Sequence, residues 1–177
     1  MNAGVPPGSS RSEEPTPNQM ALIDTLQIHA DGPVQRGTRH LQLSFPSAFV
    51  HGDDAVSLVV ERMHSWHWVS ADQADLLTHA LHEAVVNAVV HGNRGHIELM
   101  VEVELWADGQ HWDLHVNDLG KGFTQRDALR AFRGRRRNLG HGRGLVIMAG
   151  SVERLTFHNG GRTVVLGGRR TDSLRRS

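Results

Sequence analysis

The sequence of 177 residues contains no cysteine. Without thiols the protein cannot form disulfides, thiolate zinc sites, iron–sulfur clusters or a cysteine nucleophile, and such a composition fits a reducing cytoplasm. Lysine is almost absent as well, because Lys121 is the only lysine among 19 basic residues. No apolar run approaches the roughly 18 residues of a membrane span, and the N-terminus lacks a basic region followed by an apolar stretch. We therefore expect an unexported, cytoplasmic protein without a membrane partner.

Net charge of one sign is also missing, since 19 acidic residues balance 19 basic ones. The overall balance therefore does not favour binding to nucleic acid or to an anionic membrane. A chain of this length is expected to form one domain with some residues left over. It can bury about 70% of the surface that its unfolded form exposes, so a stable core requires neither metals nor disulfides.

The two ends of the chain differ in composition from the middle. Residues 1–19 contain four of the six prolines among Ser, Gly and Glu, with almost nothing to bury, which predicts a disordered tail. Residues 20–38 form an N-terminal extension whose few apolar residues either form a short strand or pack on the domain. The domain itself is predicted over residues 39–168, and residues 169–177 form a basic C-terminal tail.

Hydrophobic periodicity predicts short strands and helices in a mixed order. Period two predicts strands, period 3.6 predicts helices, and residues 119–143 have no periodicity at all. The expected elements are a strand at 40–45, helices at 47–68 and 70–91, strands at 97–105 and 112–116, a helix at 143–149, and strands at 152–157 and 163–166. This order predicts an α+β fold, a two-layer sandwich in which helices cover one face of a mostly antiparallel sheet.

Glu83 and Asn87 are the first pair of polar residues with a chemical implication. They lie four residues apart on the helix predicted over 70–91, and His91 follows after four more. At about 100° per residue, the side chains of Glu83 and Asn87 share one face of that helix. Apolar residues lie close to the same face, namely Leu76, Ala80, Ala84 and Val90. The pair therefore marks either the solvent-exposed edge of the helix or the wall of a functional site.

Two glycine-containing segments follow. The segment Asp118–Phe123, DLGKGF, ends a predicted strand. Its alternating glycines allow a ligand to approach the backbone closely, although a plain turn accounts equally well for this segment alone. The segment Gly140–Leu145, GHGRGL, opens an apolar helix, where backbone amides can form a cradle for an anion. It is neither a Walker loop nor a dinucleotide-binding fingerprint.

Taken together, in this order and spacing, the segments Glu83–Gly92, Asp118–Phe123 and Gly142–Leu145 resemble the N box and the two glycine boxes of the GHKL ATPases. This superfamily includes gyrase and the ATP-binding domains of histidine kinases. The resemblance covers about residues 40–168, and the strand and helix order agrees with it. Within the superfamily, Gly142–Met148 followed by Val152-Glu-Arg-Leu is most similar to the anti-sigma factor serine/threonine kinases of the RsbW and SpoIIAB type.

The resemblance implies a role for each motif residue. Glu83 would be the catalytic general base, and Asn87 would bind a Mg²⁺ ion that bridges the phosphates of ATP. Asp118 would accept a hydrogen bond from the adenine amino group, with Gly120 and Gly122 making room for the base. The remaining residues implied to bind the nucleotide are His91, Phe123, Gly142, Arg143, Gly144, Leu145 and Thr163.

The aperiodic stretch 119–143 corresponds to the ATP lid in this resemblance. It has a net charge of +7, from eight basic residues against Asp127 alone, whereas residues 98–118 have six acidic residues and no basic one. One interpretation is that a lid arginine stabilises transition-state charge in phosphoryl transfer, and a solvated loop is the other. Nucleic-acid binding is disfavoured, because only Phe132 lies among the arginines to stack on bases.

The 13 histidines do not form a recognisable metal motif. His82-Glu83 begins a zincin-like pattern, but Val86 occupies the position of the second histidine ligand. Most histidines are therefore expected at the surface or in packing.

The function implied by the resemblance is an ATP-dependent anti-sigma factor with serine/threonine protein kinase activity. Its implied partners are a sigma factor, which it sequesters, and an anti-sigma-factor antagonist of the STAS type, which it phosphorylates. The implied state is a homodimer without direct contact to nucleic acid. Histidine autokinase activity is disfavoured because no phosphoacceptor helix pair precedes the domain. The alternative is an ATP-binding regulatory module that controls a partner without phosphotransfer, since the same glutamate activates water in GHKL ATPases.

Overall fold

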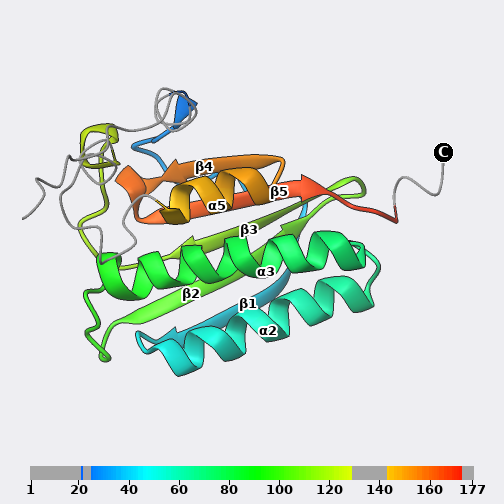
Figure 1. Ribbon diagram of the computed structural model, residues 1–177, viewed down its shortest axis with the longest axis horizontal. Coiled ribbons are helices and arrows are strands. Elements are labelled where there is room, and N and C mark those ends of the chain that lie inside the picture. The colour runs from blue at the N-terminus through cyan, green and yellow to red at the C-terminus, as the bar shows by residue number, and fades with distance from the viewer. Residues whose placement is uncertain (1–20, 22–24, 129–142, 173–177) are drawn as a thin grey trace, which may run out of the picture.

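A central antiparallel sheet organises the chain. The computed structural model describes Ala21 and residues 25–128 and 143–172, and the structural statements below concern these residues. Five strands follow the order β1-β2-β3-β5-β4, and every neighbouring pair is antiparallel. The helices lie on one face of this sheet (Figure 1). The arrangement confirms the predicted α+β fold, a two-layer sandwich with helices on one face of the sheet.

The elements follow one another in the order that the sequence predicts. They are β1 (Thr38–Pro46), α2 (Phe49–Ser65), α3 (Ala71–Val86), the π-helical segment η1 (Asn87–Gly92), β2 (Met100–Ala107), β3 (His111–Asn117), α5 (Arg143–Ser151), β4 (Arg154–His158), the 3-10 turn η3 (Asn159–Gly161) and β5 (Thr163–Arg169). Turns at Asp108-Gly109 and at Asn159–Gly161 join β2 to β3 and β4 to β5. No helix among the described residues is both long enough and apolar enough to cross a bilayer.

Helix α3, which carries Glu83 and Asn87, is fixed at its start and along its length. A capping box closes its first turn, because the Ser70 hydroxyl accepts from the amide of Gln73 and the Gln73 side chain accepts from the amide of Ser70. Its inner face packs on α2 and on the sheet. The largest fully buried side chains of this core include Met63, Leu77, Leu81, Leu105, Leu114, Met148, Phe157 and Leu166. Burying each contributes about 1.5–3 kcal/mol, so α3 has little freedom to shift.

The end of this helix differs from the prediction. The periodicity predicts a helix as far as His91, whereas the α-helix ends at Val86 and continues as the π-helical segment η1. In η1 the amide of Asn93 donates to the carbonyl of Ala88, five residues earlier, at 2.8 Å. Each such turn accommodates one residue more than an α-turn, and π-segments of this kind occur frequently at functional sites.

The strand that follows η1 also begins later than predicted. The alternation predicts a strand over 97–105, whereas β2 starts at Met100. Its neighbour β1 ends at Pro46, which is paired with Met100, so the preceding residues have no strand to pair with. They form a turn instead, in which the amide of Leu99 donates to the carbonyl of His96 at 2.9 Å and Ile97 is 62% exposed.

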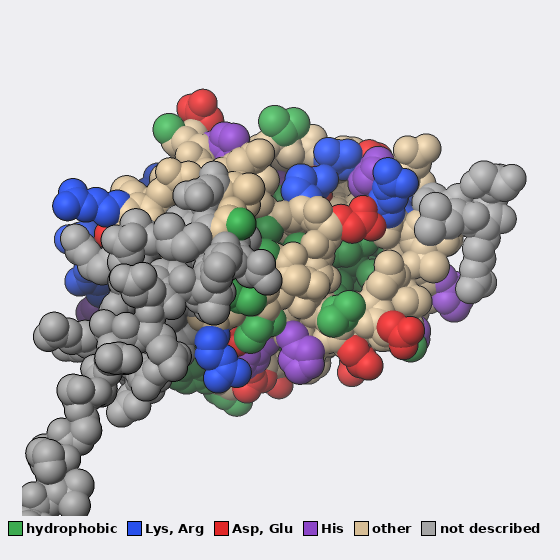
Figure 2. Space-filling view, turned by 45° about the horizontal axis from the view of Figure 1, so that its top comes forward, with side chains coloured by type: hydrophobic (Ala, Val, Ile, Leu, Met, Phe, Trp, Pro, Cys, Tyr) green, Lys and Arg blue, Asp and Glu red, His purple; other side chains and the backbone are tan. Residues whose placement is uncertain are grey.

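The surface carries charges of both signs. The face drawn in Figure 2 shows basic, acidic and histidine side chains near one another. Several described arginines pair with carboxylates, as in Arg39–Glu104 at 2.7 Å, Arg169–Glu153 at 3.8 Å and Arg170–Asp172 at 2.6 Å. Local pairing of this kind is typical of a solvated surface.

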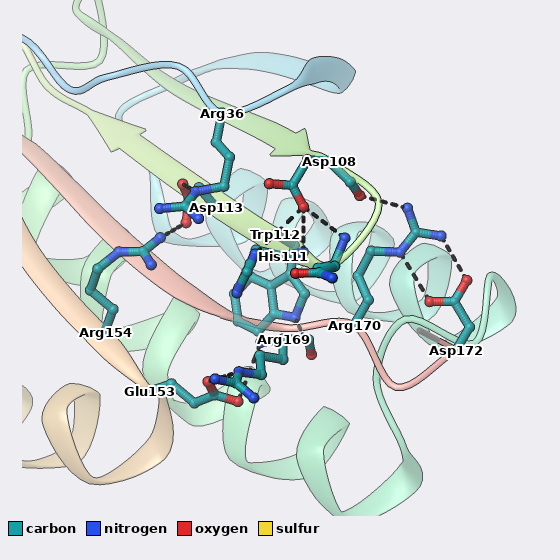
Figure 3. Close-up of polar contacts among 11 residues, drawn as sticks. Arg36, Asp108, His111, Trp112, Asp113, Glu153, Arg154, Arg169, Arg170 and Asp172 are labelled. Atoms are coloured by element: carbon teal, nitrogen blue, oxygen red, sulfur yellow. Dashed lines mark hydrogen bonds and ion pairs between the residues drawn. The ribbon is translucent and has the colours of Figure 1, made fainter. Parts of the chain in front are cut away.

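The N-terminal extension crosses the sheet face that the helices leave open. Ile28 forms a parallel bridge with Phe157 on β4, whereas β1 begins at Thr38 on the opposite edge of the sheet. The intervening residues must therefore span the sheet. Arg36 lies 3.4 Å from the carboxylate of Asp113 on β3, which also accepts a hydrogen bond from Arg154 on β4 (Figure 3). The extension thus both pairs at the edge and packs on the domain.

Strand β3 is buried on both faces, and the crossing segment contributes to this by placing Arg36 on Asp113. The alternation of Trp112, Leu114 and Val116 predicts one apolar face, yet Asp113 and His115 between them are only 3% and 1% exposed. Burial lowers the pKa of His115 to about 4, against the opposing effect of the nearby Glu104 carboxylate. His115 is therefore neutral at pH 7, a packing residue as expected for most histidines.

The predicted C-terminal end of the domain, residue 168, falls within strand β5. Strand β5 extends to Arg169, one residue beyond the predicted end of the domain. The guanidinium of Arg170 then lies 4.1 Å from the centre of the Trp68 ring, and the amide of Thr171 donates to the carbonyl of Trp68 at 2.9 Å. The predicted tail therefore starts as packed structure. The disordered tail predicted over 1–19 lies outside the described residues and stays a prediction.

Candidate functional site

A cavity of about 530 Å³ lies between α3 and η1 on one side and the sheet on the other, and the start of α5 also lines it. Its volume is in the range of small-ligand sites. Apolar side chains line much of it, including Val116, Leu145, Phe157 and Val164. Polar groups are few and come from separate elements, which is the usual composition of a site that orients its ligand.

Glu83 lies at the end of the cavity where α5 begins. Gly144, the second residue of α5, is buried directly against its side chain, and a Cβ atom at Gly144 would lie 2.6 Å from Glu83 Oε2. Arg143, Gly144 and Leu145 all line the cavity, so the first amides of α5 are close to the carboxylate. Such amides have no partner within the helix and favour a negatively charged group. A carboxylate base and an anion-binding helix terminus therefore share one end of the cavity.

Asn87 lies one turn further along the same wall. It is partly buried and lines the cavity together with Val86 and Ala88. The described residues contain no group of three or more His, Asp or Glu side chains that could hold a metal ion by themselves. An amide oxygen beside a carboxylate suits a Mg²⁺ ion only when a ligand supplies phosphate oxygens as well. The donors present thus fit an ion that enters together with a nucleotide.

The apolar environment of the Glu83 wall is only partly as predicted. Ala80 and Ala84 are completely buried, whereas Leu76 is 47% and Val90 is 37% exposed. The buried apolar surface beside Glu83 is therefore limited to the middle of the helix. Glu83 itself is neither fully buried nor fully exposed.

Asp118 lies at the opposite end, against η1. A Cβ at Gly92 would lie 2.5 and 2.6 Å from its two carboxylate oxygens, so the carboxylate sits directly on the backbone of Gly92. Burial raises the pKa of Asp118 to about 6, although the amide of Gly120 donates to Oδ1 at 2.7 Å and the charge of Arg162 opposes the shift. Gly92 lies nine residues beyond Glu83, or roughly 13 Å at the α-helical rise. The two carboxylates thus face the two ends of an elongated cavity.

The sheet side of the cavity closes where two glycine-containing turns meet. Gly122 has φ +72° and the amide of Phe123 donates to the carbonyl of Gly160 at 3.1 Å. Gly161 has φ +90°, and a Cβ there would lie 2.7 Å from the amide nitrogen of Phe123. The ring of Phe123 packs edge-to-face on Phe157 with centroids 4.9 Å apart. Left-handed glycines therefore allow the loop after β3 to lie against the turn before β5.

Comparison with known protein families gives the site its context. The family model for the histidine kinase-like ATPase domain matches residues 52–167, about two thirds of the chain. The chain belongs to this family. No curated protein matches the chain significantly. Membership confirms the resemblance to the GHKL superfamily and implies that this domain binds ATP, while the narrower resemblance to anti-sigma factor kinases has no relative to support it.

The histidine kinase-like ATPase domain brings most of the predicted site residues to one cavity. Those that line it are Glu83, Asn87, His91, Asp118, Gly122, Phe123, Arg143, Gly144 and Leu145. Gly142 lies outside the described residues. Gly120 does not line the cavity, because it packs on the backbone of Gly92, where a Cβ would collide with the Gly92 carbonyl. Gly120 therefore makes room for the protein chain, and its predicted role toward the base stays a prediction.

Thr163 also lies apart from the cavity. Its hydroxyl donates to Asn117 Oδ1 at 2.7 Å and accepts from Asn159 Nδ2 at 2.8 Å, and the residue is only 2% exposed. Since side chains alternate along a strand, Thr163 faces away from its neighbour Val164, which does line the cavity. The Thr163 side chain therefore ties β3 to β5, and its predicted contact with the nucleotide stays a prediction.

Several lining residues were not predicted. They are Val86, Ala88, Gly92, Val116, Asp127, Ala128, Phe157, Gly161 and Val164. Gly92 directly follows His91 in the N-box segment, so its position could have been inferred from the motif. The apolar residues carry no such signal, because in sequence they are indistinguishable from core positions of α3, β3, β4 and β5.

Proposed function

We propose that this ATP-binding domain is a Mg²⁺-dependent serine/threonine protein kinase of the anti-sigma factor type. The observation that carries the proposal is the placement of Glu83, which lies on the backbone of Gly144 at the start of α5 and one turn from Asn87 in the same cavity. A general base, a Mg²⁺ ligand and an anion-binding helix terminus meet there. These are the components that phosphoryl transfer requires, since its catalysis rests on positioning and electrostatics.

Each of these groups has a defined part in the proposed reaction. Asn87 and the phosphates of ATP would together hold the ion, which neutralises charge on the transferred group. Glu83 would accept the proton of a serine or threonine hydroxyl. The hydroxyl oxygen then bonds to the γ-phosphorus of ATP, and the bond between the γ-phosphorus and the oxygen that leaves with ADP breaks. The amides at the start of α5 would stabilise the phosphate charge, and Asp118 would accept from the adenine amino group at the other end of the cavity.

The partners in this proposal come from the resemblance to the RsbW and SpoIIAB type. They are a sigma factor that the protein sequesters and an STAS-type antagonist that carries the acceptor hydroxyl, and the protein would act as a homodimer in the cytoplasm.

The decisive experiment follows the γ-phosphate. Wild-type protein, Glu83→Gln and Glu61→Gln would be incubated with γ-labelled ATP, Mg²⁺ and an STAS-domain protein encoded beside this chain. Glu61 is an exposed carboxylate on α2 outside the cavity and serves as the matched control. We expect label on a serine or threonine of the STAS protein with wild type and Glu61→Gln. Glu83→Gln should lose at least 100-fold in rate while still binding ATP, a typical effect of removing a general base.

Two other outcomes would contradict the proposal. Tight ATP binding without any labelled protein would favour the alternative, an ATP-binding regulatory module that controls a partner without phosphotransfer. Absence of ATP binding by the wild-type protein would refute both functions.

A further inference from the structure

Asn93 is a buried polar residue that connects three parts of the fold. It follows η1 directly and is 1% exposed. Its side-chain nitrogen donates to the hydroxyl of Ser47 at 2.7 Å and to the carbonyl of Met100 at 3.0 Å, and its side-chain oxygen accepts from the amide of Leu119 at 2.8 Å. Both ends of the carboxamide are therefore engaged. An asparagine buried in this way joins the end of η1 to the chain after β1, the start of β2 and the loop after β3.

The bond to Leu119 bears on the cavity, because Leu119 is the neighbour of Asp118. The loop has other anchors as well: the amide of Asp118 donates to the carbonyl of Arg162, the amide of Phe123 donates to the carbonyl of Gly160, and the amide of Gly120 donates to Asp118 itself. The first two hold the loop to the sheet side of the cavity, and the third is internal to the loop. The bond from Leu119 to Asn93 ties the loop to the helical wall.

The π-helical segment places Asn93 where it can make this bond. Its amide donates to Ala88, and the amide of Gly95 donates to Val89 at 2.7 Å, so the chain turns more widely here than in an α-helix. A regular α-helix would rotate residue 93 by about one residue position, or roughly 100°, relative to the sheet. The wide turn therefore directs the carboxamide inward, where it bonds to the amide of Leu119.

We propose that Asn93 is a positioning residue for adenine recognition, which fixes the distance between the Asp118 loop and the helical wall at Gly92. The inference rests on the proposed binding of ATP with its adenine at Asp118. Asn93 itself is absent from the cavity lining, so it acts through Leu119 and not by touching the nucleotide. Because adenine and guanine differ in the group presented to Asp118, displacement of the loop affects the two nucleotides unequally.

The test separates the bond to Leu119 from the other bonds of Asn93. Asn93→Ala removes all of them. Asn93→Asp has the same shape and keeps an oxygen that accepts from the Leu119 amide, while it loses both donors. Ser47→Ala removes only the partner on the far side, where the Ser47 hydroxyl also donates to the carbonyl of Leu99 at 2.8 Å. The dissociation constants of ATP and GTP with Mg²⁺ would be measured by calorimetry at pH 7.5, and the melting temperature of each variant recorded.

We expect wild-type protein to prefer ATP to GTP. Asn93→Ala should lose at least tenfold of this preference, through weaker ATP binding with little change for GTP. Asn93→Asp should keep most of the preference, and Ser47→Ala should keep all of it even where its melting temperature falls. A purely structural role would instead lower the melting temperature of every variant and leave the ratio of the two affinities unchanged.

Several results would overturn the inference. One is an unchanged nucleotide preference in folded Asn93→Ala, and another is a loss in Ser47→Ala as large as in Asn93→Ala. If Asn93→Ala does not fold, loss of the preference in folded Asn93→Asp contradicts the inference just as directly. Wild-type protein that binds neither nucleotide, or binds both equally, would refute the proposed function at Asp118 and not the role of Asn93 alone.

Discussion

Replacing Asp118 by asparagine should make the free protein more stable while it weakens ATP binding. Burial raises the pKa of this carboxyl from 3.8 to about 6, so the ionised group is unfavourable in the folded state at neutral pH. Each pKa unit corresponds to about 1.4 kcal/mol, which gives about 3 kcal/mol for the full shift. Since the group is partly exposed, solvent screening reduces the expected gain to about 1–2 kcal/mol. Asparagine keeps the oxygen that accepts from Gly120.

The pH dependence gives the sign of this effect. The unfavourable term is fully present above pH 6, where Asp118 is ionised in both states. It shrinks as the pH falls from 6 and disappears only below 3.8, where both states are protonated. Urea denaturation of wild type and Asp118→Asn should therefore show a difference of about 1–2 kcal/mol at pH 7.5 and less than half of it at pH 4.5. In thermal melts this is an increase of roughly 2–8 °C at pH 7.5.

A matched control keeps the comparison specific. Asp75 is an exposed carboxyl on α3, and Asp75→Asn should change stability little at either pH. The reasoning is refuted if Asp118→Asn is no more stable than wild type at pH 7.5, or if its advantage is the same at both pH values. ATP affinity, measured in parallel, should fall at least tenfold in Asp118→Asn and stay unchanged in the control.

Two further predictions concern Gly144 and His115. Gly144→Ala should reduce ATP turnover at least tenfold, because its Cβ would lie 2.6 Å from Glu83 Oε2, whereas Gly150→Ala in the same helix, with no atom within 4 Å, should not. Steady-state phosphate release measures both variants, and equal rates would contradict the reasoning. His115 has a pKa of about 4 when folded against 6.5 when unfolded, so its contribution to stability is lost as the pH falls from about 6.5 to 4. Urea titrations of His115→Gln should show a smaller loss over that range than wild type; an identical slope would argue against burial of a neutral imidazole.

The sequence predicts the elements of the fold correctly where one buried face of a helix or strand determines the spacing of apolar residues. Leu77, Ala80, Leu81 and Ala84 recur at helical spacing and are all buried, so the pattern alone locates α3. The pattern fails at Asn87, because the change from α- to π-helix depends on which carbonyl each amide reaches and not on which side chains are apolar.

The outer face of the sheet could not be predicted from local patterns. Asp113 and His115 look like solvent-facing residues of a half-buried strand, and the arginines that pair with Asp113, Arg36 and Arg154, are far away in sequence. Arg36 lies 77 positions before Asp113 and reaches it only because the extension crosses from β4 to β1. Contacts of such long range are fixed by topology, which periodicity does not reveal.

The residues that line the cavity with chemical groups were easier to predict than the residues that hold them in position. Glu83, Asn87 and Asp118 stand in recognisable motifs because chemistry restricts both their types and their spacing. Asn93, in contrast, belongs to a Gly-Asn-Arg-Gly sequence that is equally typical of an ordinary turn. Its importance for the cavity depends on bonds to Ser47 and Leu119 that only the folded chain brings together.

Two motif glycines also determine how closely the walls of the cavity approach each other. The resemblance implies that Gly120 makes room for the adenine base and that Gly144 helps to hold the phosphates, and the structure adds that a side chain at Gly120 would meet the backbone of Gly92 and one at Gly144 would meet Glu83. These glycines therefore let the walls of the cavity approach each other and set where Glu83 and Asp118 stand. A substitution at either position should therefore displace a carboxylate of the cavity or the loop that carries it. If the new side chain simply occupied ligand space, a smaller ligand would restore activity. Because the carboxylate is displaced instead, we expect no such rescue.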